Sequence, residues 1–176
     1  MGSLCHLVSR RSFLHGLLIW FGLCSCRTTP TATQQAFVRL RERVVISLDA
    51  LVKNDGAYEF EAWLSPAGGS DKLLDGILLK NGDGLAAYSI YCPHEACIVK
   101  LERNPGELTS VVASDTVLPK HAVLYCACHF SVFDTRSSGR HISGPAERGL
   151  YRFLFEQKGG NVHVTHVEAS ILEVYA

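Results

Sequence analysis

The chain has 176 residues, with 17 Lys plus Arg, 17 Asp plus Glu, and a hydrophobic fraction of 47%. This length suits one domain with a short additional segment, and the apolar content is enough for a packed core, which excludes a wholly disordered chain. The balanced charge excludes the strongly basic surface that nucleic-acid binding requires, so no nucleic-acid partner is expected.

The first 26 residues have the features of an export leader. Ser9-Arg10-Arg11-Ser12-Phe13-Leu14 resembles a twin-arginine signal, and an apolar run over residues 13–24 follows it. The run is shorter than the roughly 20 residues of a membrane-spanning helix and has the length of a signal-peptide hydrophobic region. An ordinary basic leader and an uncleaved membrane anchor are the alternatives.

The end of the leader and the residues after it indicate attachment to a membrane. Leu23-Cys24-Ser25-Cys26 resembles a lipobox in which Cys26 would be lipidated, although both cysteines could be incidental. Residues 27–36 are polar and Thr-rich, which predicts a flexible linker. We therefore expect a signal peptide or anchor at 1–26, a linker at 27–36 and a folded domain at 37–176. The domain should reside at the periplasmic or extracytoplasmic face of a membrane, anchored or lipid-linked.

Beyond residue 37 the pattern is typical of short antiparallel strands. A first strand is expected at 44–48. Asn81-Gly82-Asp83-Gly84 then joins the apolar runs 77–80 and 85–91 into a hairpin, because Asn-Gly and Asp-Gly readily take positive φ.

The second half continues in the same way. Residues 124–125 predict a short strand, and Gly159-Gly160-Asn161 connects 150–155 to 162–168 in a second hairpin. The sequence therefore predicts an all-β domain, a small antiparallel sandwich or barrel.

Two cysteine–histidine boxes carry the chemistry of the domain. They are Cys92-Pro93-His94-Glu95-Ala96-Cys97 and Cys126-Ala127-Cys128-His129-Phe130-Ser131. Zinc accepts a set of two cysteines and two histidines, but it would leave one cysteine of each box without a role. Two disulfides are an alternative in an exported protein, but they would leave both histidines without a role.

The boxes resemble those of Rieske [2Fe–2S] proteins that contain a disulfide, as in quinol–cytochrome c oxidoreductases and arsenite oxidase small subunits. The boxes of that family read C-x-H-x-G-C and C-P-C-H-G-S, and the resemblance extends from about residue 77 to 168. It implies one [2Fe–2S] cluster per chain, held by loops at one tip of the domain. In such a cluster two thiolates bind one iron and two imidazoles bind the other.

The resemblance also implies a role for each matching residue. Cys92 and Cys126 would bind one iron, His94 and His129 would bind the other at the exposed edge, and Cys97 and Cys128 would form a disulfide between the loops. The Ser131 hydroxyl would bond a bridging sulfide, and Gly144-Pro145-Ala146 would match the proline loop that covers the cluster.

Four positions depart from the family pattern. Glu95 replaces the leucine that is usual in quinol-oxidising members, and Phe133 replaces a tyrosine whose hydroxyl bonds a ligand sulfur. Ala96 and Phe130 replace glycines, which fits the loops only if neither residue needs a positive φ.

The resemblance implies one-electron transfer as the function, within an oxidoreductase complex rather than as an enzyme alone. The expected partners are a cytochrome b- or c-type protein or a molybdopterin oxidase subunit, with quinol as a further candidate substrate. An exported zinc-binding or disulfide-stabilised interaction module is the alternative. Residues 100–122, which separate the boxes, are either a lobe at the cluster tip or a surface excursion.

Overall fold

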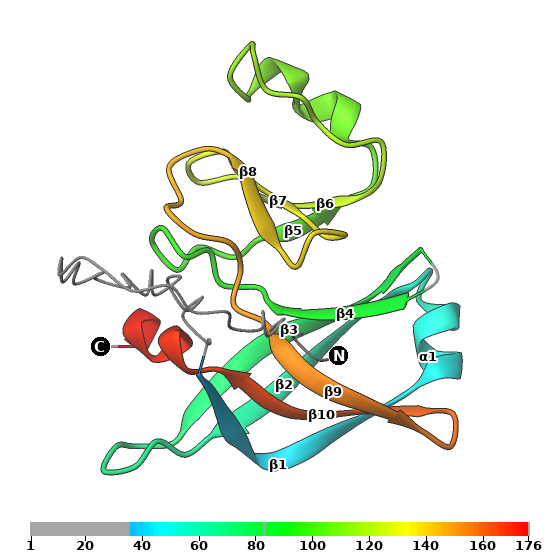
Figure 1. Cartoon of the computed structure of the whole chain (residues 1–176), viewed down its shortest axis with the longest axis vertical. Helices are drawn as coiled ribbons and strands as arrows, with labels where there is room; N and C mark the ends of the chain where they lie inside the picture. The colour runs from blue at the N-terminus through cyan, green and yellow to red at the C-terminus, as the bar shows by residue number, and fades with distance from the viewer. Residues whose placement is uncertain (1–35, 83, 176) are drawn as a thin grey trace, which may run out of the picture. The chain divides into compact units, whose positions relative to one another are not determined.

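The computed structural model describes residues 36–82 and 84–175, and within these ranges the fold is mostly antiparallel β-structure (Figure 1). The predicted all-β class is confirmed. The predicted leader, with Cys26, and the predicted linker up to residue 35 lie outside the described residues. The strands are β1 (Phe37–Ser47), β2 (Ala57–Leu64), β3 (Lys72–Asn81), β4 (Gly84–Ser89), β5 (Lys100–Glu102), β6 (Val123–Cys126), β7 (Ser131–Asp134), β8 (Arg140–Ser143), β9 (Phe153–Lys158) and β10 (Asn161–Glu168).

Two three-stranded sheets form the base of the domain. Their strand orders are β1-β10-β9 and β2-β3-β4, so the first and last strands of the domain pair with each other. Alternate side chains of both sheets point inward, and Phe60 meets Phe153 edge to face with ring centroids 5.1 Å apart. Burial of this apolar surface is the main force that holds the two sheets together. The fully buried members of this core include Leu74, Leu78, Val162, Val164, Val167 and Ile171.

Both predicted hairpins are present. β3 pairs with β4 through a turn that contains Gly82 at φ +66°, and β9 pairs with β10 through Gly159 and Gly160, which also have positive φ. Glycine adopts this backbone region without steric cost, which is why the turn residues predicted these hairpins correctly.

The helical segments were not predicted. The helix α1 (Leu48–Lys53) begins where Ser47 accepts a hydrogen bond from the backbone N–H of Asp49, and it buries Leu51. The expected strand at 44–48 is therefore the end of a longer strand, and Leu48 already belongs to the helix. A 3-10 helix, η2 (Ala169–Tyr175), follows β10. Among the described residues, no helix is long and apolar enough to cross a membrane.

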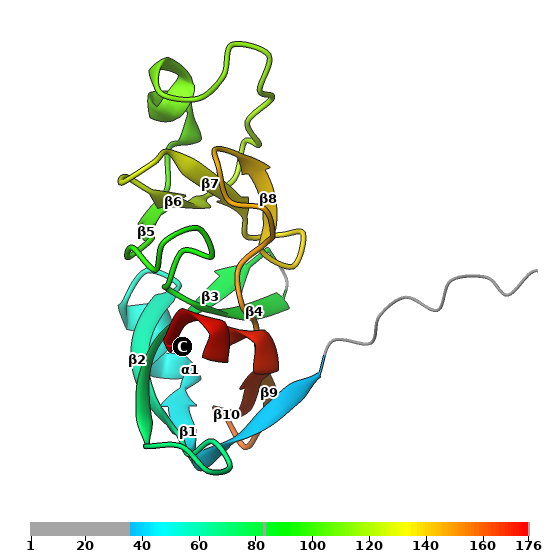
Figure 2. The same ribbon diagram turned by 90° about the vertical axis from the view of Figure 1, so that its left-hand side faces the viewer.

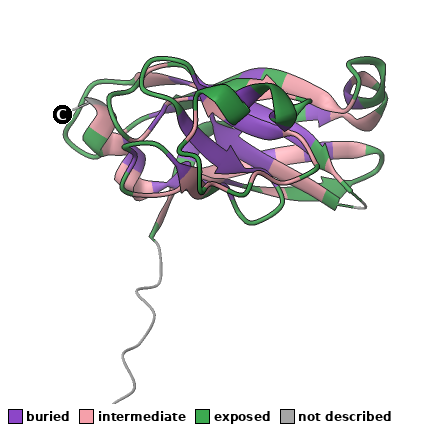
Figure 3. Ribbon diagram, turned by 90° about the horizontal axis from the view of Figure 1, so that it is seen from above, coloured by how far each residue is buried: buried purple, intermediate pink, exposed green. Residues whose placement is uncertain are grey.

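A four-stranded sheet in the order β5-β6-β7-β8 lies against the β3–β4 hairpin (Figure 2). Side chains alternate along its strands, so Leu124 and Phe133 face the hairpin while Val123 and Val132 face the other way. Figure 3 shows how buried residues concentrate on the strands while the connecting loops are largely exposed.

Residues 103–122 cover the outer face of that sheet. The segment contains the 3-10 helix η1 (Pro105–Ser110), and Leu108, Val112 and Leu118 pack against Val123 and Val132. It joins the ends of β5 and β6 that point away from the two boxes, since the boxes directly precede β5 and follow β6. The interpretation as a lobe inserted at the cluster tip is therefore wrong. The segment is a surface excursion with a small core of its own.

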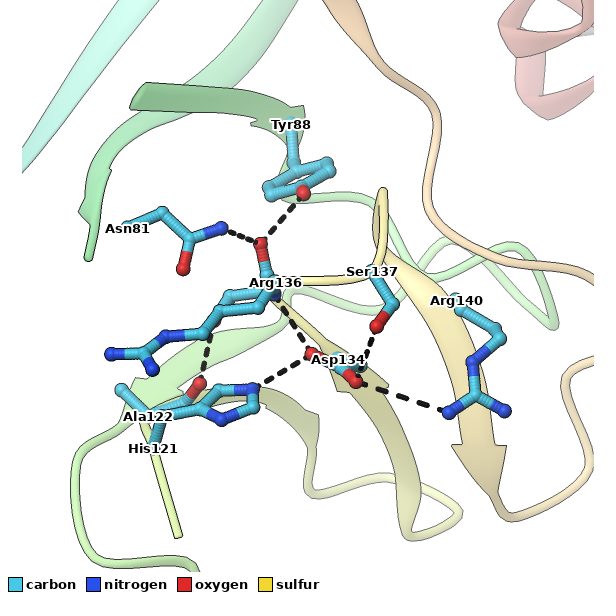
Figure 4. A network of polar contacts seen from close by, with 9 residues as sticks. Asn81, Tyr88, His121, Ala122, Asp134, Arg136, Ser137 and Arg140 are labelled. Carbon is cyan, nitrogen blue, oxygen red and sulfur yellow. Dashed lines mark hydrogen bonds and ion pairs between the residues drawn. The ribbon is translucent and has the colours of Figure 1, made fainter. Parts of the chain in front are cut away.

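Asp134, at the end of β7, organises the turn to β8 (Figure 4). Its carboxylate lies 2.8 Å from His121 Nε2 and accepts hydrogen bonds from the Arg136 backbone N–H and the Ser137 hydroxyl, each also at 2.8 Å. The next carbonyl, that of Thr135, accepts hydrogen bonds from the β3–β4 hairpin, donated by the Asn81 amide and the Tyr88 hydroxyl.

These contacts change the acidity of Asp134. Burial alone would raise its pKa, but the hydrogen bonds from His121, the Arg136 backbone and Ser137 outweigh that effect and lower the pKa. Because the folded-state pKa lies below the unfolded value of about 3.9, the stabilising contribution is fully present above about pH 4 and is lost as the pH falls.

Asp134→Asn should lower the free energy of unfolding at pH 7 by about 2–3 kcal/mol, because three donors lose a charged acceptor. The difference from wild type should shrink as the pH falls below about 4. Denaturant unfolding followed by circular dichroism at several pH values measures both effects. Asp71→Asn, which affects only exposed contacts, an ion pair with Arg41 and a hydrogen bond from the Ser65 hydroxyl, is the matched control and should cost less than about 1 kcal/mol.

Candidate metal centre

The first box forms a tight loop directly after β4. The Cys92 backbone N–H donates to the Cys97 carbonyl at 2.8 Å, and the Ala96 N–H donates to the Cys92 carbonyl at 2.9 Å. Tyr91 and Ile98 pair across the base of this loop. These contacts close the first box into a compact loop, which holds its cysteine and histidine side chains close together.

The second box occupies the turn of the β6–β7 hairpin. Cys126 and Ser131 are its last paired residues, and both are fully buried, while residues 127–130 form the exposed turn. The pairing of the buried strands β6 and β7 thus fixes the position of the loop that connects them.

A disulfide between Cys97 and Cys128 joins the two loops, with a Cα–Cα distance of 6.6 Å. Cys92 and Cys126 are free and buried. The predicted disulfide is therefore present, and the alternative in which all four thiols form two disulfides is wrong. The cross-link leaves one free thiol and one imidazole in each loop.

His94 and His129 meet on the outer side of the joined loops. Both are exposed, their ring centroids are 4.8 Å apart, and Glu95 Oε2 lies 3.7 Å from His129 Nε2. The structure therefore separates two buried sulfur donors from two exposed nitrogen donors, although the cysteines are 34 positions apart and the histidines 35.

The loop after β8 packs directly on the second box. A Cβ atom added to Gly144 would lie 2.5 Å from the Ser131 Cα and 2.7 Å from the Phe130 carbonyl oxygen, and Gly144 has φ +96°. Only glycine permits this approach, because any side chain would meet backbone atoms. The Ala146 backbone N–H then donates to the buried Ser131 hydroxyl at 3.3 Å, and Pro145 remains exposed beside it.

The free thiols are in an environment that suits a cation. Burial raises the pKa of the Cys92 thiol and the nearby Cys126 sulfur raises it further, whereas a backbone hydrogen bond at His94 and one from the Ser131 hydroxyl lower it. Two neighbouring buried thiolates repel one another, so a positive ion between them is the natural compensation. Two thiols and two imidazoles are also the donor set of a [2Fe–2S] centre with mixed ligands, so the residues present fit such a group.

The model of the Rieske [2Fe-2S] domain matches residues 70–166 of this chain. The chain belongs to the Rieske [2Fe–2S] domain family. Its domain therefore binds a [2Fe–2S] cluster and serves electron transfer. A comparison with curated protein sequences gives no match.

Several solved structures are similar to this chain. The plasma membrane Rieske protein PetC3 of the cyanobacterium Synechocystis PCC 6803 is 21% identical, with 69% of this chain and 97% of that chain covered at a TM-score of 0.43. The ferredoxin of carbazole 1,9a-dioxygenase from Nocardioides aromaticivorans IC177 is 18% identical, with 73% and 96% covered at 0.42. The soluble domain of the Rieske protein II (soxF) from Sulfolobus acidocaldarius is 21% identical, with 77% and 70% covered at 0.38.

The structure also places the remaining predicted site residues of this Rieske domain. Phe133 is fully buried in the same apolar cluster as Cys92 and Cys126, and its ring meets that of His141 at 5.9 Å. Arg148, which the sequence did not single out, follows the Gly144–Ala146 loop and forms an ion pair with the buried Glu168 on β10. That pair ties the loop over the boxes to the base sheet.

Ala96 and Phe130 adopt φ of +56° and +62°. Ala96 and Phe130 would fit without strain only if neither had a positive φ, and the structure shows that both do. Each box retains the left-handed backbone for which glycine is best suited, while carrying a side chain that makes this conformation costly by roughly 1–2 kcal/mol.

Ala96→Gly should raise the free energy of unfolding of the Rieske domain by about 1 kcal/mol, because glycine removes the strain at positive φ. Ala127→Gly is the control, since Ala127 is an exposed alanine of the second box without a positive φ. It should lower the stability, by about 0.5–1 kcal/mol. Calorimetric unfolding midpoints compare the two, and a loss of stability in both variants would contradict the strain assigned to Ala96.

Proposed function

We propose that this Rieske domain passes one electron at a time between a donor and a metalloprotein acceptor, through a cluster bound by Cys92, Cys126, His94 and His129. The observation that carries the assignment is the cross-linked pair of loops, which leaves these four donors free and together. When bound, a [2Fe–2S] centre with two imidazole ligands stores and releases one electron at a higher potential than an all-cysteine centre.

The residues of the chain have distinct tasks in this proposal. Cys92 and Cys126 hold the inner side of the centre in a dry environment, because both are buried beneath the loops. His94 and His129 form the outer side, where the electron can enter and leave. The Ser131 hydroxyl accepts a hydrogen bond from the Ala146 N–H, and its own hydrogen remains available to bond the Cys92 sulfur.

The protein works, in our proposal, as an electron-transfer subunit of a membrane-associated or periplasmic oxidoreductase. Two classes of complex fit, a quinol–cytochrome c reductase and a molybdopterin oxidase of the arsenite oxidase type. Glu95 favours the second class, because a charged and well exposed carboxylate beside His129 is a poor surface for an apolar quinol. We further propose export by the twin-arginine route, with Cys26 or the uncleaved leader as the membrane attachment.

The ligand assignment can be tested by removing one donor at a time. Cys92→Ser, His94→Ala, Cys126→Ser and His129→Ala should each abolish the Rieske EPR signal of the reduced protein, because each removes an iron ligand. His163→Ala, a histidine of β10 outside the boxes, should leave the signal intact. Cys97→Ala should retain the cluster but lower the stability by about 2–4 kcal/mol, as expected for loss of a disulfide. A full-strength signal in any of the four ligand variants contradicts the assignment.

The hydrogen bonds near the sulfurs should set the reduction potential. Bonds to cluster sulfurs stabilise the added electron, and this chain keeps Ser131 while Phe133 cannot donate a bond. We expect a positive but moderate potential within the Rieske range of about −150 to +300 mV, lowered by Ser131→Ala and raised by Phe133→Tyr. Protein-film voltammetry measures it. Ser47→Ala, which removes the hydroxyl that caps α1, should leave the potential unchanged.

The export proposal has its own test. Replacing both Arg10 and Arg11 with lysine keeps the charge of the leader but should block twin-arginine transport, so that precursor accumulates in the cytoplasm. Cell fractionation measures this, and undiminished export of the double-lysine variant would rule out the route. Mass spectrometry of the mature N-terminus shows whether Cys26 carries a lipid.

A further inference from the structure

The three loops around the metal centre have an uneven charge. Residues 92–99, 126–131 and 143–147 contain two carboxylates, Glu95 and Glu147, and neither lysine nor arginine. Both glutamates are exposed. The basic residues nearest along the chain lie just outside these loops, as Lys100 on β5 and as Arg148, which is engaged with the buried Glu168.

Glu95 occupies the point at which a redox partner must approach. Its side chain is 60% exposed, and its carboxylate lies within 4.8 Å of donor atoms of both His94 and His129. A protein that receives the electron through the exposed imidazoles will therefore contact this carboxylate as well.

The rest of the tip is largely apolar. Ala96, Ala127 and Pro145 are exposed, and the Phe130 side chain stands out with 45% of its surface accessible. A partner that covers these groups removes water from Glu95. Removing water from an ionised carboxylate costs free energy unless a cation replaces the water. A carboxylate that pairs with a cation of the partner makes binding more specific and speeds the association of the two proteins.

We propose that this tip docks onto a cationic surface, and that Glu95 selects the partner by pairing with a lysine or arginine beside the partner's redox centre. The inference rests on the proposed function, since it assumes that the electron leaves through the histidine edge. It adds the chemistry of the partner, which is a basic protein surface rather than an acidic surface or a neutral small molecule.

Two small oxidants of opposite charge test the proposal on the cluster-loaded full chain. Stopped-flow oxidation of the reduced protein is followed with the cationic tris(phenanthroline)cobalt(III) and with the anionic hexacyanoferrate(III). Glu95→Gln should slow the reaction with the cation and speed the reaction with the anion, each by about three- to tenfold at low salt. At about 1 M salt, where charges are screened beyond about 3 Å, the variant and the wild type should converge.

Glu61→Gln is the matched control, because Glu61 is an exposed glutamate of β2 in the base and the change in charge is the same. A second readout does not depend on electron transfer. The redox-inert cation hexaamminechromium(III) should broaden the NMR signal of the Ala96 methyl group, which is exposed and directly follows Glu95, in wild type and Glu61→Gln, and not in Glu95→Gln.

The outcomes separate the inference from the proposed function. A protein with a Rieske EPR signal whose rates respond to Glu95→Gln in the same direction with both oxidants, or not at all, overturns the cationic partner alone. Absence of any Rieske signal in the wild-type chain overturns both. Opposite shifts that vanish at high salt, with the control unchanged, support the proposal.

Discussion

The disulfide between Cys97 and Cys128 is the covalent constraint that holds the two loops of the metal centre against each other. The cross-linked residues are 31 positions apart, and the bridge adds a covalent link to the pairing of β5 with β6, the strands that follow the first loop and precede the second. Closing such a span restricts the unfolded chain and, in the folded domain, fixes the loops against each other. The bridge also decides which thiols remain, so that the free pair is the buried one and the histidines meet outside it.

A second layer of contacts holds the joined loops in place. Gly144 lies against the backbone of the second box, and the Ala146 N–H bonds the Ser131 hydroxyl. Arg148 then connects this loop to Glu168 at the end of β10, so the base sheet supports the tip from a distance. On the other side, Asp134 and Thr135 fasten the β7–β8 turn to His121 and to the β3–β4 hairpin. Electron transfer favours such a rigid site, because the ligands then need little rearrangement when the charge changes.

The sequence was most informative where local chemistry determines the structure. The all-β class and both hairpins followed from alternating strands and from glycine-rich turns, and the disulfide and the free cysteines followed from the resemblance of the two boxes. The covering role of residues 103–122 could not be predicted, because it depends on which end of the β5–β6 pair the segment joins. The Asp134 network was also missed, since its partners are brought together only by the sheet. The sequence left open whether Ala96 and Phe130 have a positive φ, because neither residue type favours that conformation.

Pulsed EPR of the reduced full chain labelled with ¹⁵N-histidine shows whether two imidazoles bind the iron, because it detects nuclei coupled to the paramagnetic iron pair. We expect couplings from two histidine nitrogens, with one lost in any residual centre of His94→Ala or His129→Ala, and with both retained in His163→Ala. A paramagnetic centre without strongly coupled histidine nitrogen, or a purified chain that binds zinc in place of iron, would contradict it.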